Sequence, residues 1–247
     1  MPDSIRGGAE GHPHGSSWSF DLGSGVVPWV GSAPPDVRTL RSVRSIRSRS
    51  GAGHVPTWAY STTVGAHIRL ESGLEHDLLR DLDCNPAIAW LGSQPARIHP
   101  RRPGTKRTGL VPDLMSLTAD GAVTVWAVKP VGRQNDKFLA EVEETTAACA
   151  EFGWAHRVFA GMDVIRRSNL MWLDGFRQTM PWYGDALGAL RDGGDTLLLS
   201  DVLEVDAGQG HVLSAVWHGL RKGQLEANLD ASFTAATELR FVEEDAA

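Results

Sequence analysis

Cysteine is scarce in this chain, and its scarcity excludes two kinds of small protein. The 247 residues contain two cysteines, Cys84 and Cys149, which are too few for a disulfide framework and lack the spacing of a zinc site. No apolar run approaches the roughly 20 residues that span a bilayer, and the N-terminus lacks the apolar segment of a signal peptide. We therefore expect a soluble protein of the reducing cytoplasm with no membrane partner.

Motifs for nucleotide and protease chemistry are missing as well. The sequence has no Walker A motif, no dinucleotide-binding glycine fingerprint and no HExxH pair. Hydrophobic residues make up 42% and charged residues 22%, which are globular values, and the length suffices for one large or two ordinary domains. The net charge of -6 argues against a surface coated in positive charge but leaves room for local basic patches.

The N-terminal segment is rich in Gly, Pro, Ser and His up to about residue 35. Such a composition buries too little apolar surface to offset the entropy of the chain. Residues 1–55 are therefore predicted to form a largely disordered arm. Trp18, Phe20 and Trp29 are its candidates for docking onto another surface.

Two basic segments are candidates for DNA contact, and neither contains an acid. The first, VRTLRSVRSIRSRS, carries an arginine at every third position: Arg38, Arg41, Arg44 and Arg47. The second, RIHPRRPGTKR, carries Arg97, Arg101, Arg102, Lys106 and Arg107. Each segment is interpretable as a solvated surface or as a stretch that lies along phosphates. The second one joins a predicted strand to a predicted hairpin, which favours a phosphate contact next to a site.

The order of predicted elements indicates an α/β protein. A helix begins near Ser72, a plausible N-cap with Glu75 three residues on, and a strand, a hairpin at 111–130, a helix ending near Gly153 and a strand follow. This gives an α/β domain over 56–162, a mixed sheet flanked by helices. Residues 163–247 then read as helices followed by two strands, the order of a winged-helix-like domain.

The hairpin VPDLMSLTADGAVTVWAVKP places charged groups whose relation depends on the turn. Ala127 and Lys129 point to one face of their strand, roughly 6.6 Å apart. A two-residue Asp-Gly loop would turn Asp113 to the opposite face. A three-residue loop with Gly121 left-handed would pair Asp113 with Ala127. Periodicity alone leaves both registers open.

The second register would suit phosphodiester chemistry. A divalent metal held by carboxylates activates water, and a nearby lysine stabilises charge that develops on the phosphate. That chemistry needs Asp113, an acid or amide at 127, and Lys129, with Glu75 as the best further carboxylate and Glu71 next. The alternative interpretation is ordinary: a turn aspartate and an exposed lysine at a strand end.

The ordered series ESGLEHDLL, NPAIAWLGSQPARI, VPDLMSL, VTVWAVKP and AHRVF resembles the PD-(D/E)xK nuclease superfamily. Within it, the series looks like the TnsA-type endonuclease subunits of heteromeric transposases, over about residues 60–160. The resemblance implies a restriction-endonuclease-like mixed sheet plus a C-terminal winged-helix-like domain. It implies Glu75 and Asp113 as metal ligands, Lys129 as the catalytic lysine and Gln94 as an active-site neighbour.

The same resemblance implies partners and a cofactor. Such subunits use Mg²⁺ or Mn²⁺, with two ions per site, to cut one strand at double-stranded transposon ends during cut-and-paste transposition in the bacterial cytosol. An RNase H-like transposase makes the other cut, and an AAA+ regulator couples the two.

Ala127 departs from the family pattern, which has an acid or sometimes an amide there. Either the chain is a natural pseudo-nuclease, or a carboxylate was replaced, which retention of Glu75, Asp113 and Lys129 favours. We thus expect an endonuclease subunit that is inactive with this alanine. The alternatives are a catalytically dead assembly factor that binds DNA or protein, and a stand-alone repair or restriction nuclease.

Overall fold

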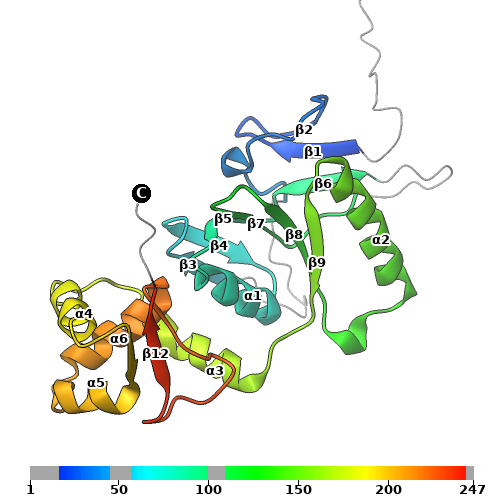
Figure 1. The fold of residues 1–247 in the computed structure, drawn as a ribbon. Coiled ribbons are helices and arrows are strands. Elements are labelled where there is room, and N and C mark those ends of the chain that lie inside the picture. Colours follow the sequence, from blue (N-terminus) through cyan, green and yellow to red (C-terminus); the bar gives the residue numbers. More distant parts are fainter. Residues whose placement is uncertain (1–16, 45–56, 100–108, 243–247) are drawn as a thin grey trace, which may run out of the picture. The chain divides into compact units, whose positions relative to one another are not determined.

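The computed structural model describes residues 17–44, 57–99 and 109–242 of the chain. It is a mixed α/β structure (Figure 1) whose contacts divide into two units. Unit 1 comprises Met1–Glu75 and Ile88–Ala160, and unit 2 comprises His76–Ala87 and Gly161–Ala247. The prediction placed the boundary at 162/163 and did not anticipate that residues 76–87 would belong with the C-terminal unit.

The main sheet of unit 1 has four strands in the order β5-β7-β8-β9. These strands are β5 (Ile88–Ser93), β7 (Leu114–Thr118), β8 (Val123–Val128) and β9 (Ala155–Phe159). β5, β7 and β8 pair antiparallel, whereas β9 pairs parallel to β8. A parallel pair needs a crossover, and helix α2 (Asp136–Glu151) supplies it. The side chain of Asn135 caps its start by accepting the Phe138 N–H, and Gly153 follows its end at φ +70°.

A second sheet in unit 1 corrects the prediction for the N-terminal arm. Strands β1 (Ser17–Asp21), β2 (Val26–Pro28) and β6 (Ala96–His99) pair in the order β2-β1-β6. Trp18 is 2% and Phe20 0% exposed; their rings stack on each other in the core, and both meet Trp154 edge-on. Aromatic rings bury large apolar areas, so a few of them outweigh the polar composition around them. Residues 17–44 are therefore folded, while 1–16 and 45–55 lie outside the described residues.

A two-stranded hairpin precedes the first α-helix, and the sequence patterns had not revealed it. It consists of β3 (Thr57–Ser61) and β4 (Ala66–Leu70), with Ala59, Ile68 and Leu70 buried on one face. Helix α1 (Gly73–Asp83) follows. Two short 3-10 helices also belong to this unit: η1 (Val37–Thr39) follows β2, and η2 (Val131–Arg133) follows β8.

Unit 2 contains helices and a small antiparallel sheet of order β10-β12-β11. The elements are α3 (Val164–Leu173), η3 (Asp174–Phe176), α4 (Tyr183–Arg191), β10 (Thr196–Leu198), α5 (Leu199–Asp206), α6 (His211–Lys222), β11 (Leu225–Glu226) and β12 (Glu238–Phe241). The predicted helices and the two final strands are present. Strand β10 was not predicted, because three residues are too few for a detectable alternation.

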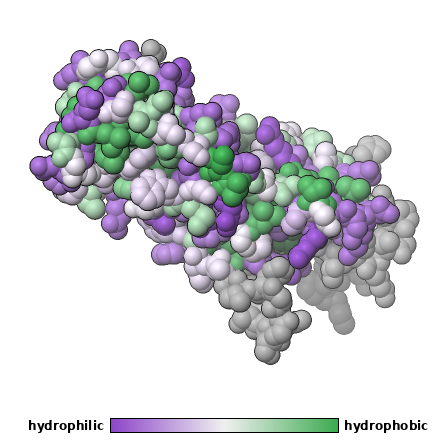
Figure 2. Space-filling view, turned by 90° about the horizontal axis from the view of Figure 1, so that it is seen from below, coloured by the Kyte–Doolittle hydropathy of each residue, from purple (hydrophilic) through white to green (hydrophobic). Residues whose placement is uncertain are grey.

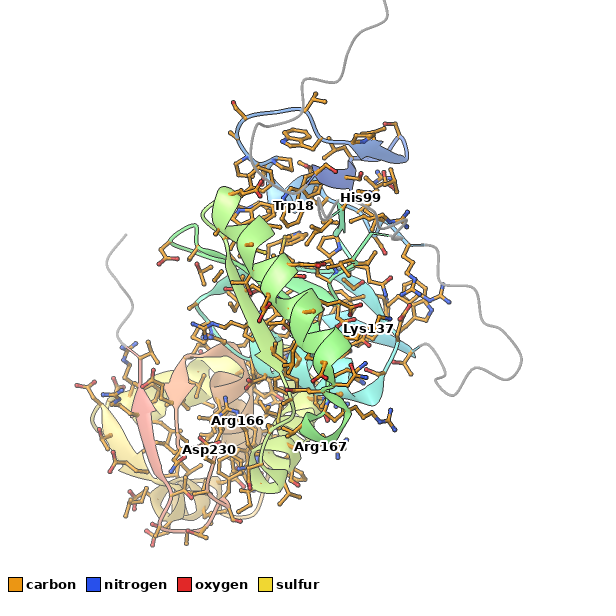
Figure 3. The ribbon with its side chains drawn as sticks, turned by 90° about the vertical axis from the view of Figure 1, so that its right-hand side faces the viewer. Trp18, His99, Lys137, Arg166, Arg167 and Asp230 are labelled. Carbon is orange, nitrogen blue, oxygen red and sulfur yellow. The ribbon has the colours of Figure 1, made fainter. Side chains whose placement is uncertain are left out.

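Helix α6 is the centre of unit 2, since every residue from 215 to 221 is buried. Arg221 is among them, and its Nη1 donates to the carbonyl of Asp83 at 2.6 Å while its Nη2 pairs with the Asp83 carboxylate. Further pairs join Arg80 to Asp174 at 2.9 Å and Arg166 to Asp81 at 2.6 Å. Figure 3 shows Arg166 and Asp230 in this unit, a pair 3.3 Å apart.

Two absences can be stated for the described ranges. None of their helices is both long and apolar enough to cross a bilayer. Both cysteines are free thiols, and burial raises the pKa of Cys84 to about 11. On the face drawn in Figure 2, hydrophobic residues form separate patches among hydrophilic ones.

Candidate functional site

The hairpin between β7 and β8 adopts the three-residue loop. The ladder pairs Leu114 with Trp126 and Leu117 with Val123. Gly121 has φ +91°, the left-handed conformation that this loop requires. The ladder ends at the pair Leu114–Trp126, and Asp113 directly precedes it.

Packing explains why the hairpin adopts the three-residue loop and not the two-residue Asp-Gly loop. Met115, Leu117, Val123 and Val125 all have exposures of 9% or less and belong to one core. A one-residue slip would turn one strand's apolar set to the other face. The hydroxyl of Thr118 also accepts the Ala122 N–H at 2.9 Å and so holds the longer loop.

Three predicted site positions line one cavity. Asp113, Ala127 and Lys129 border a pocket of about 220 Å³ in unit 1, together with side chains of α2 and β9. The chain enters the site irregularly: the N–H of Asp113 donates to the Trp126 carbonyl at 3.0 Å, and its Oδ2 accepts the Val128 N–H at 2.7 Å. The carboxylate of Asp113 is thus anchored to the strand that carries Ala127 and Lys129.

Asp113 is a carboxylate in an unfavourable environment. It is half-buried, and desolvation is the main cause that raises its pKa from 3.8 to about 7. The hydrogen bond from Val128 opposes that rise, the charges of Glu75 and Glu71 add to it, and Lys129 opposes it. Glu75, Glu71 and Lys129 are therefore close enough to Asp113 for their charges to act on it.

Glu75 caps helix α1, as the sequence predicts. Its N–H donates to Ser72 Oγ at 3.2 Å, and Ser72 Oγ donates to Glu75 Oε1 at 2.7 Å. Glu75 Oε2 accepts the N–H of Glu71 at 2.8 Å. The side chain is 5% exposed and does not border the cavity. Its carboxylate reaches Asp113 as a charge, while both oxygens accept hydrogen bonds at the helix start.

Lys129 and Gln94 are held by backbone bonds on either side of Asp113. The Lys129 N–H donates to the Phe159 carbonyl at 3.0 Å, and its ammonium lies 5.6 Å from the ring centroid of Phe138. Gln94 is 2% exposed with φ +48°, and its N–H donates to the Asp113 carbonyl at 3.0 Å. Gln94 is a neighbour of Asp113 through its backbone.

The predicted basic contacts are only partly described. Arg47, Arg101, Arg102, Lys106 and Arg107 lie outside the described residues. Exposed Arg38 pairs with Asp36 at 3.7 Å, and exposed Arg44 pairs with partly buried Glu71 at 3.3 Å. Arg41 is exposed, and Arg97 on β6 is half-buried with an Nε that has no hydrogen-bond partner in the described ranges. The first arginine series is therefore not an acid-free stripe in space.

Two cavity residues were missed because a crossover brings them in. Glu141 lies on α2 and pairs with Lys137, which Figure 3 labels, at 3.8 Å. His156 lies on β9 opposite Val125, with Nδ1 2.9 Å from Thr146 Oγ1. Burial lowers the pKa of His156. A parallel β-α-β unit would have predicted their approach, since such a helix packs back on its sheet.

The donor set does not complete a metal site. Across the described ranges, no three or more His, Cys, Asp or Glu side chains are arranged to hold an ion. Asp113 offers oxygen ligands of the kind Mg²⁺ takes, but the oxygens of Glu75 serve the helix cap and Ala127 offers only a methyl group. The residues present thus fit a metal incompletely, and position 127 is where the set is short.

In unit 2, only one of the two basic residues at the end of α6 is exposed. Arg221 is 2% exposed and paired with Asp83, so it is not available to a ligand. Lys222, next to it, is exposed.

Comparison with known proteins adds no relative to this picture. No protein-family model matches the sequence, and no curated protein matches it. A functional assignment therefore rests on the cavity and the residues around it.

Proposed function

We propose that unit 1 is a nuclease-type unit of the PD-(D/E)xK kind, silent in this chain because position 127 is alanine. The observation that carries the proposal is the convergence of Asp113, Ala127 and Lys129 on one cavity. The charge of Glu75 acts on the same Asp113. In a TnsA-like assembly this unit would cut one strand at a double-stranded transposon end, beside an RNase H-like transposase and an AAA+ regulator.

The roles follow from the chemistry of the groups. Asp113, Glu75 and a restored acid at 127 would hold Mg²⁺ or Mn²⁺, one or two ions, which would activate water against a phosphodiester. Lys129 would stabilise negative charge on the phosphate, because it borders the same cavity as Asp113 and carries a cationic side chain. Exposed basic residues on this unit would contact the flanking phosphates.

The deciding experiment restores the missing acid. Ala127→Asp and Ala127→Glu add a carboxylate to the cavity that Asp113 also borders, so we expect Mg²⁺-dependent conversion of supercoiled plasmid DNA to nicked circles. A loss of one liganding group typically removes orders of magnitude in rate, so the gain should exceed about a hundredfold over the alanine chain. The assay is run with and without EDTA.

Matched variants make the result specific. Thr124→Asp adds the same charge to the same strand on the other face, since Thr124 pairs with Ser116; it should stay inactive. Adding Asp113→Asn or Lys129→Ala to the active variant should abolish nicking. If neither restored acid produces Mg²⁺-dependent cleavage, alone or with partner transposase, the nuclease proposal fails.

A second candidate is an assembly factor that binds DNA or protein without cleaving. The observation that favours it is the commitment of both Glu75 oxygens to the helix start, where a metal would have to compete. Binding of transposon-end duplex that is equal with and without Mg²⁺, combined with inactivity of Ala127→Asp, would select it. Cleavage that needs no partner would select a stand-alone repair or restriction nuclease.

Unit 2 would serve this function as a winged-helix-like partner domain. The order α4, β10, α5, α6, β11, β12, with β12 between β10 and β11, supports that assignment. Because most of α6 is buried and Arg221 is paired inside, protein contact is a better role for this unit than base reading.

A further inference from the structure

The outer face of the β3–β4 hairpin carries aromatic rings that its fold does not use. Trp58 is 63% exposed and Tyr60 is 40% exposed. The buried residues of the hairpin, such as Ile68 and Leu70, lie on the opposite face. Large aromatic side chains on the open side of a sheet commonly mark a binding surface.

Each ring faces a basic side chain on the neighbouring strand. Trp58 pairs with Arg69 and Tyr60 with His67. The guanidinium of Arg69 lies 5.8 Å from the Trp58 ring centroid, and the His67 ring meets Tyr60 edge-on at 5.3 Å. These four residues, Trp58, Tyr60, His67 and Arg69, form what we call the aromatic face.

The charge of this face has one sign. Residues 57–70, TWAYSTTVGAHIRL, contain no Asp or Glu. Arg69 has no salt bridge within the described ranges, and its shielded Nε has no hydrogen-bond partner there. Trp58 and Tyr60 sit two residues apart, about 6.6 Å along the strand, or roughly twice the 3.4 Å rise of stacked bases.

We propose that the aromatic face binds single-stranded nucleic acid by stacking unpaired bases on Trp58 and Tyr60. Arg69 and His67 stand where they can contact the phosphates that connect those bases. Duplex DNA offers no such bases, because its rings are stacked inside. The proposal goes beyond the nuclease proposal and does not depend on it, since it uses neither Asp113 nor position 127.

The test is fluorescence anisotropy of a labelled oligothymidylate of about 16 nucleotides with the full chain, without Mg²⁺. Trp58→Ala should bind about tenfold more weakly, because one stacked base is lost. Trp58→Phe should retain most of the affinity. Arg69→Ala should lower the salt dependence of log K by about 0.7, as expected for one phosphate contact to a single strand.

Controls separate this surface from general effects. Trp172→Ala removes a tryptophan of similar exposure, 54%, from unit 2 and should leave binding unchanged. An oligouridylate in parallel distinguishes RNA from DNA as the source of the bases. No oligonucleotide binding, equal loss in Trp172→Ala, or no loss in Trp58→Ala and Arg69→Ala would each overturn the proposal, as would equal binding of a duplex.

Discussion

At the scale of single residues, two opposing effects act on the pKa of Asp113. Its oxygen accepts a backbone N–H at 2.7 Å, which favours the ionised form, yet desolvation dominates and raises its pKa to about 7. A cation placed in the cavity would relieve the same penalty. The residue is therefore costly to the free protein near neutral pH, as is common for groups that await a ligand.

Asp113 makes unit 1 less stable as pH rises. Its pKa is about 7 when folded and near 3.8 when unfolded, so its contribution is fully present below about pH 4 and is lost as pH rises through about 7. Asp113→Asn removes this effect. Because Asp113 is partly exposed and solvent screens its charge, the variant should gain about 2 kcal/mol over the parent between pH 5 and pH 8.

Urea unfolding in EDTA at both pH values measures this gain. Each histidine whose pKa burial lowers is shared by both proteins, so the difference isolates Asp113. Asp120→Asn is the control: the pKa of Asp120 is lowered, chiefly by its hydrogen bond from Thr118, so it stays ionised across this window. An equal gain in Asp120→Asn, or none in Asp113→Asn, would contradict the assigned cause.

At the scale of helices and strands, the sequence predicts those features that depend on neighbouring residues alone. The cap at Ser72 and Glu75 and the stop at Gly153 are confirmed. The loop between β7 and β8 could not be decided, because the Asp-Gly signal is local while the register is set by four core residues on two strands. The cavity position of His156 could not be predicted for a similar reason: it borders the same cavity as Lys129 only because of the α2 crossover.

For strand β1 the prediction was wrong because it used the average composition of the segment. That average did not reveal the few aromatic residues that form a core strand. Phe20 is fully buried and stacks 5.7 Å from Trp18. We expect Phe20→Ala to lower the unfolding free energy of unit 1 by about 3–5 kcal/mol, from lost burial and a cavity. Leu22→Ala, at a residue 42% exposed, should change it by less than about 0.5 kcal/mol.

Guanidinium unfolding followed by far-UV circular dichroism makes the comparison between Phe20→Ala and Leu22→Ala. Similar stabilities for the two variants would mean that β1 is not an integral strand. Protection of β1 amides from hydrogen exchange in the parent provides a second measure.

At the scale of the whole molecule, unit 2 is built from two stretches that are not adjacent in the sequence. Residues 76–87 lie between two stretches of unit 1 in the sequence yet belong to unit 2. Their acids pair with arginines that come more than 80 residues later, as in Arg167 to Asp77 at 2.8 Å. Ion pairs between residues so far apart produce no local sequence pattern. The sequence therefore predicted one domain boundary and not the exchange of residues 76–87.

This arrangement predicts that residues 161–247 do not fold stably alone. Such a fragment keeps Arg221 but loses Asp83, its buried partner. Removing one member of a buried ion pair costs about 3–5 kcal/mol, a large share of the 5–15 kcal/mol that stabilises a typical domain. We expect a loss of cooperative thermal unfolding, measured by circular dichroism.

A peptide of residues 73–87 should restore the cooperative transition, and the same peptide with Asp83→Ala should restore less. In the full chain, Arg221→Met combined with Asp83→Leu should be more stable than either single variant, because no charge is left buried without its partner. A fragment that unfolds cooperatively by itself, at the temperature of unit 2 in the full chain, would show that 76–87 is an accessory to this unit. The other outcome is a peptide that fails to restore the transition while the full chain still unfolds cooperatively. That result would mean that the ion pairs form only when both segments belong to one covalent chain.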